Sequence, residues 1–213
     1  KASPKVTPVM RNDHDKMVQN IHEALVKCNA HDGMTVSFHH HFRNGDKVLN
    51  MVMEEVHAMG IKNITICASS LGGQNDPIVY MLDDGTITNI ESSGVRGEIG
   101  KAISNGRLQG LAIMRSHGAR SRAIMSGETH IDIAFIGAPT ADEYGNLNAN
   151  GGKADCGVLS YSAVDAEYAD RVVAITDTLV PFPNLPAQIS QVKVDYVVKV
   201  DEIGDPTKIA TGA

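Results

Sequence analysis

Tryptophan is absent from this sequence of 213 residues, and aromatic residues of all kinds amount to only 4% of it. A hydrophobic core must therefore be built mainly from isoleucine, valine, leucine, methionine and alanine, and apolar residues, at 42% of the chain, are plentiful enough for one. No run approaches the roughly 18 consecutive apolar residues of a membrane-spanning helix, and residues 1–10 contain no secretory apolar segment. We therefore expect a globular protein without a membrane partner.

Cysteine and positive charge are scarce as well. The three cysteines, Cys28, Cys67 and Cys156, lie far apart and form no CxxC pair, so we expect neither a disulfide framework nor a zinc knuckle. This usage favours the reducing cytoplasm. Cys67 ends an apolar run with no neighbouring histidine to act as a base, which is typical of inert packing. The net charge of −6 argues against a nucleic-acid partner.

Helix-like and strand-like segments alternate along the chain. Helices are expected where apolar residues recur every three or four positions, and strands where short apolar runs end in turn residues. The expected helices cover 15–30, 47–59, 98–105, 119–126 and 163–168. The expected strands cover 34–38, 61–68, 86–90, 111–114, 131–136, 172–176 and 196–200. This alternation predicts an α/β fold, with an open, mostly parallel sheet and helices on both of its faces.

The loop at 37–43 follows the first of these strands and contains three consecutive histidines and Arg43. Ligands of open α/β sheets bind at the carboxyl ends of the strands, which makes this loop a candidate. Side chains alternate along an extended backbone, so His39 and His41 can converge while His40 points away. We favour an anion or carbonyl bound by imidazole N–H groups and Arg43. A polar loop satisfied by backbone is one alternative. A metal site is the other, disfavoured because no acidic residue lies at helical spacing.

A glycine-rich turn at 91–100 joins an expected strand to an expected helix. Its glycines at 94, 97 and 100 allow backbone N–H groups to approach an anion at the start of the helix. The pattern differs from the GxGxxG fingerprint, so we expect no nicotinamide site. A plain tight turn explains the same glycines equally well.

A cluster of basic and polar residues occupies the strand-to-helix corner at 115–122. The cluster consists of Arg115, Ser116, His117, Arg120 and Arg122. Guanidinium groups match carboxylate and phosphate geometry with two parallel hydrogen bonds. Arginine at the start of a helix also opposes the helix dipole unless an anion is bound there. The cluster therefore predicts a site for a di- or tricarboxylate or a phosphate.

Six segments together resemble the CoA-transferase family. The residues at 141–146, ADEYGN, follow an expected buried strand, and their turn chemistry is similar to the A-D-x-x-G-N segment of that family. Five more stretches resemble the citrate lyase alpha subunits in particular, in the expected order and over nearly the whole chain. They are SFHHHFRNGD (37–46), ESSGVRG (91–97), RSHGAR (115–120), ITDTLVPFP (175–183) and VDEIGDP (200–206). The RSHGAR stretch has Ala119 where a second glycine is expected.

The resemblance implies a transferase that exchanges acetyl for citryl on an acyl-carrier thioester, giving acetate and citryl carrier. It implies no permanently bound cofactor, because CoA or a dephospho-CoA-type prosthetic group of the carrier is a substrate. The expected partners are citrate, acetate, an acyl carrier subunit and a lyase beta subunit, in an oligomer. Another acyl-CoA:carboxylate transferase, or a non-catalytic module of the same fold that binds small anions, is the alternative.

The resemblance also assigns expected roles to the loop residues. Substrate carboxylates are expected to bind Arg43, Arg115, Ser116, His117, Arg120 and Arg122. The thioester and its oxyanion are expected to meet Phe38, His39, His40, His41, Gly94, Val95, Arg96 and Gly97. No metal ligand is expected, and the attacking group is not identified. Many CoA-transferases use a glutamate from a second, similar domain, and Glu91, Glu98 and Glu128 lie in no matching motif. We therefore expect residues 1–213 to be the N-terminal domain, with that second domain and its glutamate outside this chain.

Overall fold

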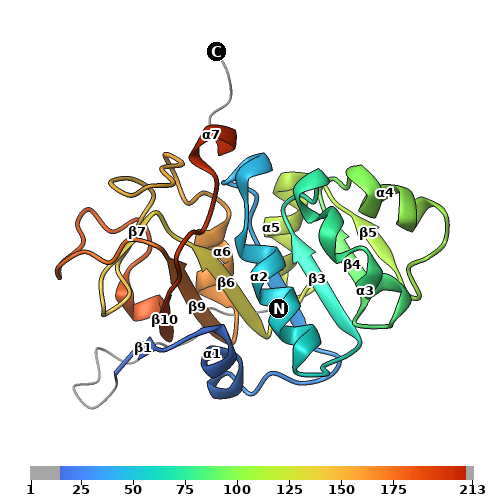
Figure 1. Cartoon of the computed structure of the whole chain (residues 1–213), viewed down its shortest axis with the longest axis horizontal. Helices are drawn as coiled ribbons and strands as arrows, with labels where there is room; N and C mark the ends of the chain where they lie inside the picture. Colours follow the sequence, from blue (N-terminus) through green and yellow to red (C-terminus); the bar gives the residue numbers. More distant parts are fainter. Residues whose placement is uncertain (1–14, 210–213) are drawn as a thin grey trace.

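An eight-stranded sheet forms the centre of the computed structural model, which describes residues 15–209 (Figure 1). The strands lie in the order β1-β10-β9-β6-β2-β3-β4-β5, and every neighbouring pair is parallel. Their bounds are β1 (Met17–Val18), β2 (Thr35–Phe38), β3 (Ile64–Ala68), β4 (Ile87–Ser92), β5 (Ala112–Met114), β6 (Ile133–Gly137), β9 (Arg171–Thr176) and β10 (Tyr196–Lys199). The antiparallel pair β7 (Thr140–Ala141) and β8 (Leu147–Asn148) lies outside this sheet.

Helices cover both faces of the sheet, as the sequence predicts. They are α1 (Ile21–Lys27), α2 (Val48–Ala58), α3 (Tyr80–Asp83), α4 (Gly97–Ser104), α5 (His117–Ser126), α6 (Ser162–Tyr168) and α7 (Pro206–Ile209). Alternate residues of β6 show the two layers: Ile133 and Phe135 pack in one hydrophobic cluster with α1 to α4. Ala134 and Ile136 pack in the other, with α5 and α6. In Figure 1, α2 accordingly lies in front of the sheet and α6 behind it.

One expected helix begins later than its apolar spacing predicts. The helix expected over 15–30 starts at Ile21, because Met17 and Val18 instead pair with β10 as strand β1. Asn20 marks the true start, since its side-chain oxygen accepts the Glu23 backbone N–H at 2.9 Å. Sheet pairing therefore overrides helical spacing here. The other expected segments agree with the structure to within about three residues at each end.

The strand order reverses between β2 and β6, which are neighbours in the sheet. From β2 the chain proceeds outward through β3 and β4 to β5, and from β6 it proceeds the other way through β9 to β10. Loops that leave two such strands diverge, and ligands of open α/β sheets bind in the resulting crevice at the carboxyl ends. The fold therefore places the expected histidine loop, which follows β2, at this reversal.

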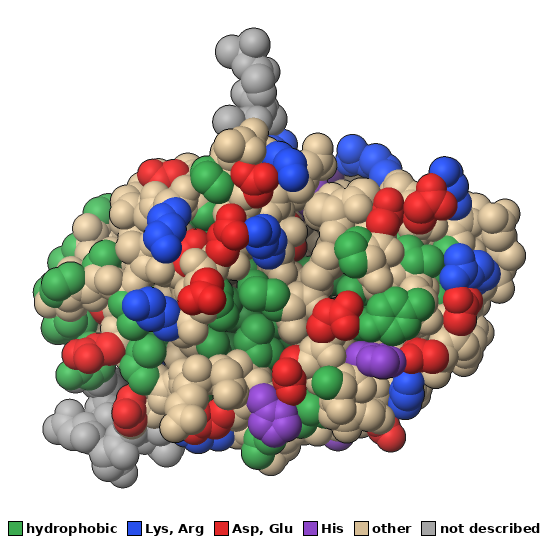
Figure 2. Space-filling view, viewed as in Figure 1, with side chains coloured by type: hydrophobic (Ala, Val, Ile, Leu, Met, Phe, Trp, Pro, Cys, Tyr) green, Lys and Arg blue, Asp and Glu red, His purple; other side chains and the backbone are tan. Residues whose placement is uncertain are grey.

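Charged side chains of both signs are interspersed over the face seen in Figure 2, with apolar side chains between them. This face of the described chain carries no broad area of a single charge. Within residues 15–209 no helix is long and apolar enough to cross a membrane.

The ADEYGN segment is organised by the buried carboxylate of Asp142. It accepts hydrogen bonds from the backbone N–H groups of Tyr144 (3.0 Å), Asn146 (3.0 Å) and Asn184 (2.9 Å). The Asn146 side-chain amide donates to it as well, at 2.8 Å. Asn184 belongs to the loop between β9 and β10, so one carboxylate joins two loops that are distant in sequence. Asp142, which the sequence predicts as a turn residue, thus also forms a tertiary contact.

Replacing Asp142 with Ala should lower the free energy of unfolding by about 3 kcal/mol or more, because several buried N–H donors then lose their acceptor. Replacing its exposed neighbour Glu143 with Ala should change it by less than about 0.5 kcal/mol. Urea titration of both variants followed by circular dichroism checks this. Equal, small effects would contradict the structural role given to Asp142.

Candidate active site

Two adjoining cavities lie at the carboxyl ends of the strands. The histidine cavity, of about 240 Å³, is bounded by His39, His40, His41, Ser69 and residues of the segment 156–161. The arginine cavity, of about 420 Å³, is bounded by Ser70, Ser93, Gly94, Arg96 and Lys208. His40, Arg43 and His117 line both. The two cavities therefore form one continuous candidate site.

Positive charge dominates this site. Arg43, Arg96 and Lys208 line it, and among the described residues no aspartate or glutamate does. Lys208 also pairs with Asp205, the residue just before its own helix α7, at 3.2 Å. Burial, followed by the positive charges of Arg96 and Arg43, lowers the pKa of His40 from its ordinary value. The same field that disfavours a proton on His40 favours a bound anion.

The turn that carries Arg43 is held by the C-terminal part of the chain. Arg43 itself has a positive φ of 51°. The Asp205 backbone N–H donates to the Gly45 carbonyl at 2.9 Å, and the Lys47 N–H donates to the Ile203 carbonyl at 3.1 Å. A Cβ atom at Gly45 would lie 2.5 Å from the Asp205 carbonyl oxygen, so only glycine fits there. Arg43 is therefore placed at the site by a tight backbone clamp.

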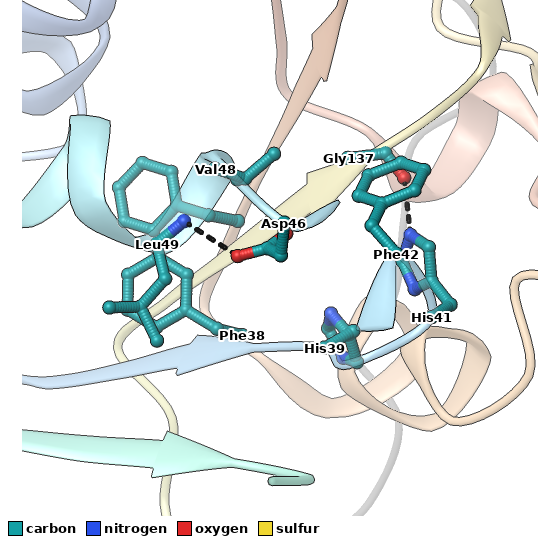
Figure 3. Close-up of a pocket in the computed structure, with 9 residues that line it drawn as sticks. Phe38, His39, His41, Phe42, Asp46, Val48, Leu49 and Gly137 are labelled. Atoms are coloured by element: carbon teal, nitrogen blue, oxygen red, sulfur yellow. Dashed lines mark hydrogen bonds between the residues drawn. The ribbon is translucent and has the colours of Figure 1, made fainter. Parts of the chain in front are cut away.

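The structure brings His39 and His41 together as the sequence predicts, but His40 lines the same cavity instead of pointing away from it. The rings of His39 and His41 stack with their centroids 6.0 Å apart, while the backbone N–H of His40 donates to the Ser69 hydroxyl at 2.8 Å. His41 Nε2 donates to the Gly137 carbonyl oxygen at 2.8 Å, as Figure 3 shows, and this bond joins the ends of β2 and β6. Burial, followed by the neighbouring His39, lowers the pKa of His41 to about 3, so its ring is neutral.

Arg120, expected to bind substrate, lies inside the protein. Its guanidinium holds the Asp165 carboxylate with two hydrogen bonds, of 2.9 and 2.6 Å, and also donates to the Cys67 carbonyl at 3.3 Å. Arg120 is 2% exposed and Asp165 0%. Burial alone disfavours an ionised carboxylate, yet Arg120 and His39 hold the pKa of Asp165 well below its usual range. The same carboxylate accepts from His39 Nε2 at 2.8 Å, so Arg120 reaches the site only through Asp165 and His39.

The other two expected arginines are paired with protein carboxylates. Arg115 donates to Glu128 at 2.7 Å and to Glu91 at 3.3 Å, and Arg122 donates to Glu128 at 2.7 Å. Neither arginine lines the two cavities. Arg115 and Arg122 therefore meet at Glu128 outside the cavities, whereas Arg120, on another side of helix α5 from Arg122, points into the protein.

Of the same cluster, His117 alone lines the cavities. It lies 5.3 Å from the Tyr161 ring, centroid to centroid. Ser116 caps helix α5, because its hydroxyl oxygen accepts the Ala119 backbone N–H at 3.2 Å. The polar and basic residues that predicted an anion site at this corner thus include a helix cap, Ser116, and arginines that form ion pairs within the protein.

The residues expected at the thioester separate in a similar way. Phe38 is a core residue that stacks on Phe135 at 5.7 Å between ring centroids. Gly94 and Arg96 line the arginine cavity, whereas Val95 bridges to Leu71 of the neighbouring loop.

Gly97, with a φ of 71°, opens helix α4, and the N-terminus of this helix already holds a carboxylate of the protein. Asp76 accepts the N–H groups of Glu98 at 2.7 Å and of Ile99 at 3.4 Å. The anion for which Gly97 makes room is therefore Asp76 itself, whose Oδ1 would lie 2.5 Å from a Cβ atom at that position.

Several residues that line the cavities were not predicted from the sequence. Ser69 and Ser70 follow β3, so the rule that ligands bind at carboxyl ends could have found them. Tyr161 and Lys208 come from segments that no local pattern connects to the site.

Cys156 lines the histidine cavity, but burial raises the pKa of its thiol to about 12. Burial likewise raises the pKa of Cys67 to about 12, which fits the inert packing expected for it.

One group of side chains in residues 15–209 has the spacing of metal ligands, and it lies away from the cavities. Ligand atoms of His130, Asp132 and Asp170 fall within 4.8 Å of one another, just before β6 and β9 begin. This is the opposite edge of the sheet from the histidine loop. The ring nitrogens of that loop that do have partners bond instead to Asp165, to the Gly137 carbonyl and to the Gln74 side-chain amide.

Replacing Arg120 with Leu should lower the free energy of unfolding by about 3–5 kcal/mol, because it leaves the Asp165 charge buried with only His39 beside it. Replacing Arg122 with Leu removes an exposed ion pair and should cost less than about 1 kcal/mol. Chemical denaturation of the two variants gives the comparison. Similar midpoints would argue that the Arg120–Asp165 pair is not structural.

Asp46 makes stability depend on pH. It is buried beside the histidine loop, where its Oδ2 accepts the Leu49 N–H at 3.3 Å (Figure 3). Burial raises the pKa of Asp46 from 3.8 to about 7, although the N–H groups of Leu49 and Val48 act in the opposite direction. The folded state therefore holds this proton more tightly than the unfolded state does, and the associated stability is lost as the pH rises toward 7.

Asp46→Asn should abolish this dependence. Between about pH 4 and pH 7, the free energy of unfolding of the wild type should fall relative to that of the variant, by on the order of 2–4 kcal/mol. Other titrating groups are common to both proteins and cancel in the difference. Denaturant titrations at several pH values measure it, and a constant difference would contradict the raised pKa.

Comparison with known proteins supports the resemblance read from the sequence. Residues 14–213 match the sequence model of the family described as citrate lyase, alpha subunit. The citrate lyase alpha chain of Haemophilus influenzae is 46% identical over 213 residues, which is 100% of this chain and 43% of that protein. The chain of Escherichia coli is 46% identical over 212 residues, or 99% of this chain and 42% of that protein. This chain thus spans less than half the length of these relatives.

Solved structures agree with the fold. A Streptococcus mutans crystal structure assigned to the alpha subunit of citrate lyase, in complex with citrate, superposes with a TM-score of 0.94 and 51% identity, over 97% of this chain and 40% of that one. Glutaconate coenzyme A-transferase from Acidaminococcus fermentans superposes with a TM-score of 0.63 at 14% identity, over 86% of this chain and 75% of that one, which shows a common fold. Taken with the family match over residues 14–213, these findings show that the chain belongs to the citrate lyase alpha subunit family.

Proposed function

We propose that this chain supplies substrate-binding loops of a citrate CoA-transferase, which converts an acetyl-carrier thioester and citrate into a citryl-carrier thioester and acetate. The observation that carries the proposal is the continuous site lined by Arg43, Arg96 and Lys208 and by no described carboxylate, in a chain of this family. The citrate held by the Streptococcus mutans relative supports the choice of substrate.

The charges of the site suit the reaction. Citrate carries three carboxylates, and arginine forks bind carboxylates with two parallel hydrogen bonds. A citrate carboxylate oxygen attacks the acetyl carbonyl and the carrier thiolate leaves, which gives a mixed anhydride. The thiolate then attacks the citryl carbonyl and acetate leaves. Because an anhydride is short-lived in water, the loops must hold both partners in place and exclude water.

The oxyanion formed in each attack needs hydrogen-bond donors. The imidazole groups of His40 and His117 lie where the two cavities join and are suited to donate. The arginine cavity is suited to the phosphate groups of CoA, or of a dephospho-CoA-type arm on the carrier. Both would be substrates rather than resident cofactors.

The whole protein is proposed to act in a cytoplasmic complex with an acyl carrier subunit and a lyase beta subunit. A second domain beyond residue 213 is proposed to complete the site and to supply any nucleophilic glutamate. Another acyl-CoA:carboxylate transferase is the alternative within the enzyme class, and a panel of carboxylate acceptors separates the two. A non-catalytic anion-binding module would bind citrate without any exchange.

The test is exchange of labelled acetate into an acetyl-carrier thioester and its dependence on citrate, measured with the full-length protein in its complex. Arg96→Ala should lower exchange by about tenfold or more, because a carboxylate or phosphate loses its guanidinium partner. Arg107→Ala is the matched control, since Arg107 is an exposed arginine that pairs with Asp83 outside both cavities. Absence of exchange in the wild-type complex would contradict the proposed function.

A further inference from the structure

His39 is held as a single tautomer. Asp165 is ionised and can only accept hydrogen bonds, so the hydrogen between it and His39 must lie on His39 Nε2. In the neutral ring the Nδ1 atom then carries a bare lone pair.

The Nδ1 atom of His39 is left without a partner. It is buried, and no donor in residues 15–209 reaches it. Leaving a buried acceptor unpaired is costly, so such an atom in a native structure calls for an explanation. The His39 side chain is 3% exposed and lines the histidine cavity. Its Nδ1 atom is itself covered in the structure, so a ligand in the cavity supplies the missing donor once the side chains around it shift.

The rest of the site is rich in donors. Arg43, Arg96 and Lys208 only donate, so the charged groups of the site complement carboxylates and cannot accept a hydroxyl hydrogen. A ligand with both carboxylates and a hydroxyl needs at least one acceptor placed among these donors. His39 Nδ1 is such an acceptor.

We propose that His39 Nδ1 accepts the hydrogen of the substrate hydroxyl, so that the site selects hydroxy-carboxylates over carboxylates that lack the hydroxyl. Arg120 and Asp165 act as positioning residues, because they fix the tautomer and orientation of His39. This inference rests on the proposed function and deepens it by assigning the specificity-determining contact. For citrate, the discriminating ligand is propane-1,2,3-tricarboxylate, which has the three carboxylates of citrate without its hydroxyl.

The experiment measures the dissociation constants of both tricarboxylates by calorimetry with the full-length protein. The wild type should bind citrate at least about tenfold more tightly than propane-1,2,3-tricarboxylate. His39→Phe keeps the Arg120–Asp165 pair and should remove this preference, weakening citrate while leaving the other ligand unchanged. Arg43→Ala should weaken both ligands by similar factors, because it removes charge complementarity common to both. His22→Phe, at an exposed histidine that pairs with Glu55, should change neither.

The outcomes separate the two proposals. A His39→Phe variant that still prefers citrate as strongly as the wild type overturns the inference. Equal binding of both ligands by the wild type overturns it too and leaves the proposed function standing, whereas binding of neither ligand counts against the proposed function itself.

A second measurement does not depend on any variant folding. Nitrogen NMR of the wild-type imidazoles should show His39 Nδ1 unprotonated and shifted by citrate but not by propane-1,2,3-tricarboxylate. A protonated Nδ1, or identical responses to the two ligands, would overturn the inference.

Discussion

The buried ion pair between Arg120 and Asp165 is the contact on which the loops around the histidine cavity depend. Taking each charge out of water costs on the order of several kcal/mol, which the two-bond geometry offsets only together with further hydrogen bonds. Those bonds come from His39 and from the Cys67 carbonyl. The pair therefore connects α5, α6, the end of β3 and the loop after β2. Losing either charge would leave the other buried without its partner. The hydrogen bonds that join these segments would then be weakened or lost.

The parallel sheet explains why cations distant in sequence share one site. The loops after β2 and β4 leave the same edge of the sheet, and they bring Arg43 and Arg96 to one cavity. Close spacing in sequence had the opposite outcome at the start of α5. There, Arg115 and Arg122 bind the Glu128 carboxylate, and Arg120 binds Asp165 inside the protein. Density of charge along a helix is thus a poor guide to where charge gathers in space.

Sequence patterns described the elements well where a single physical requirement acted on them. The apolar spacing of α2 and the glycine that follows it, Gly60 with a φ of 73°, both agree with the structure. The sequence also predicts that His39 and His41 lie together, although the structure brings them together at a turn closed by the Arg43 N–H and the His40 carbonyl and not along an extended strand. The helix predicted from residue 15 was wrong at its start, because Met17 fits helical spacing but instead pairs with the edge of strand β10. The glycines before α4 were read as room for an anion, without any sign that Asp76 supplies it.

The amino-acid sequence by itself determined the α/β class, the parallel sheet with two helical layers, and which loops leave the carboxyl ends of the strands, because periodicity and turn residues are local properties. It also carried the family resemblance. Only the tertiary structure decided which of those loops' cations remain available to a ligand, because each arginine binds whichever carboxylate the fold brings within reach. Arg120 met Asp165, Arg115 met Glu91 and Glu128, and Arg43 and Arg96 were left facing the cavities. Such pairings join positions far apart in the chain, and no local pattern encodes them.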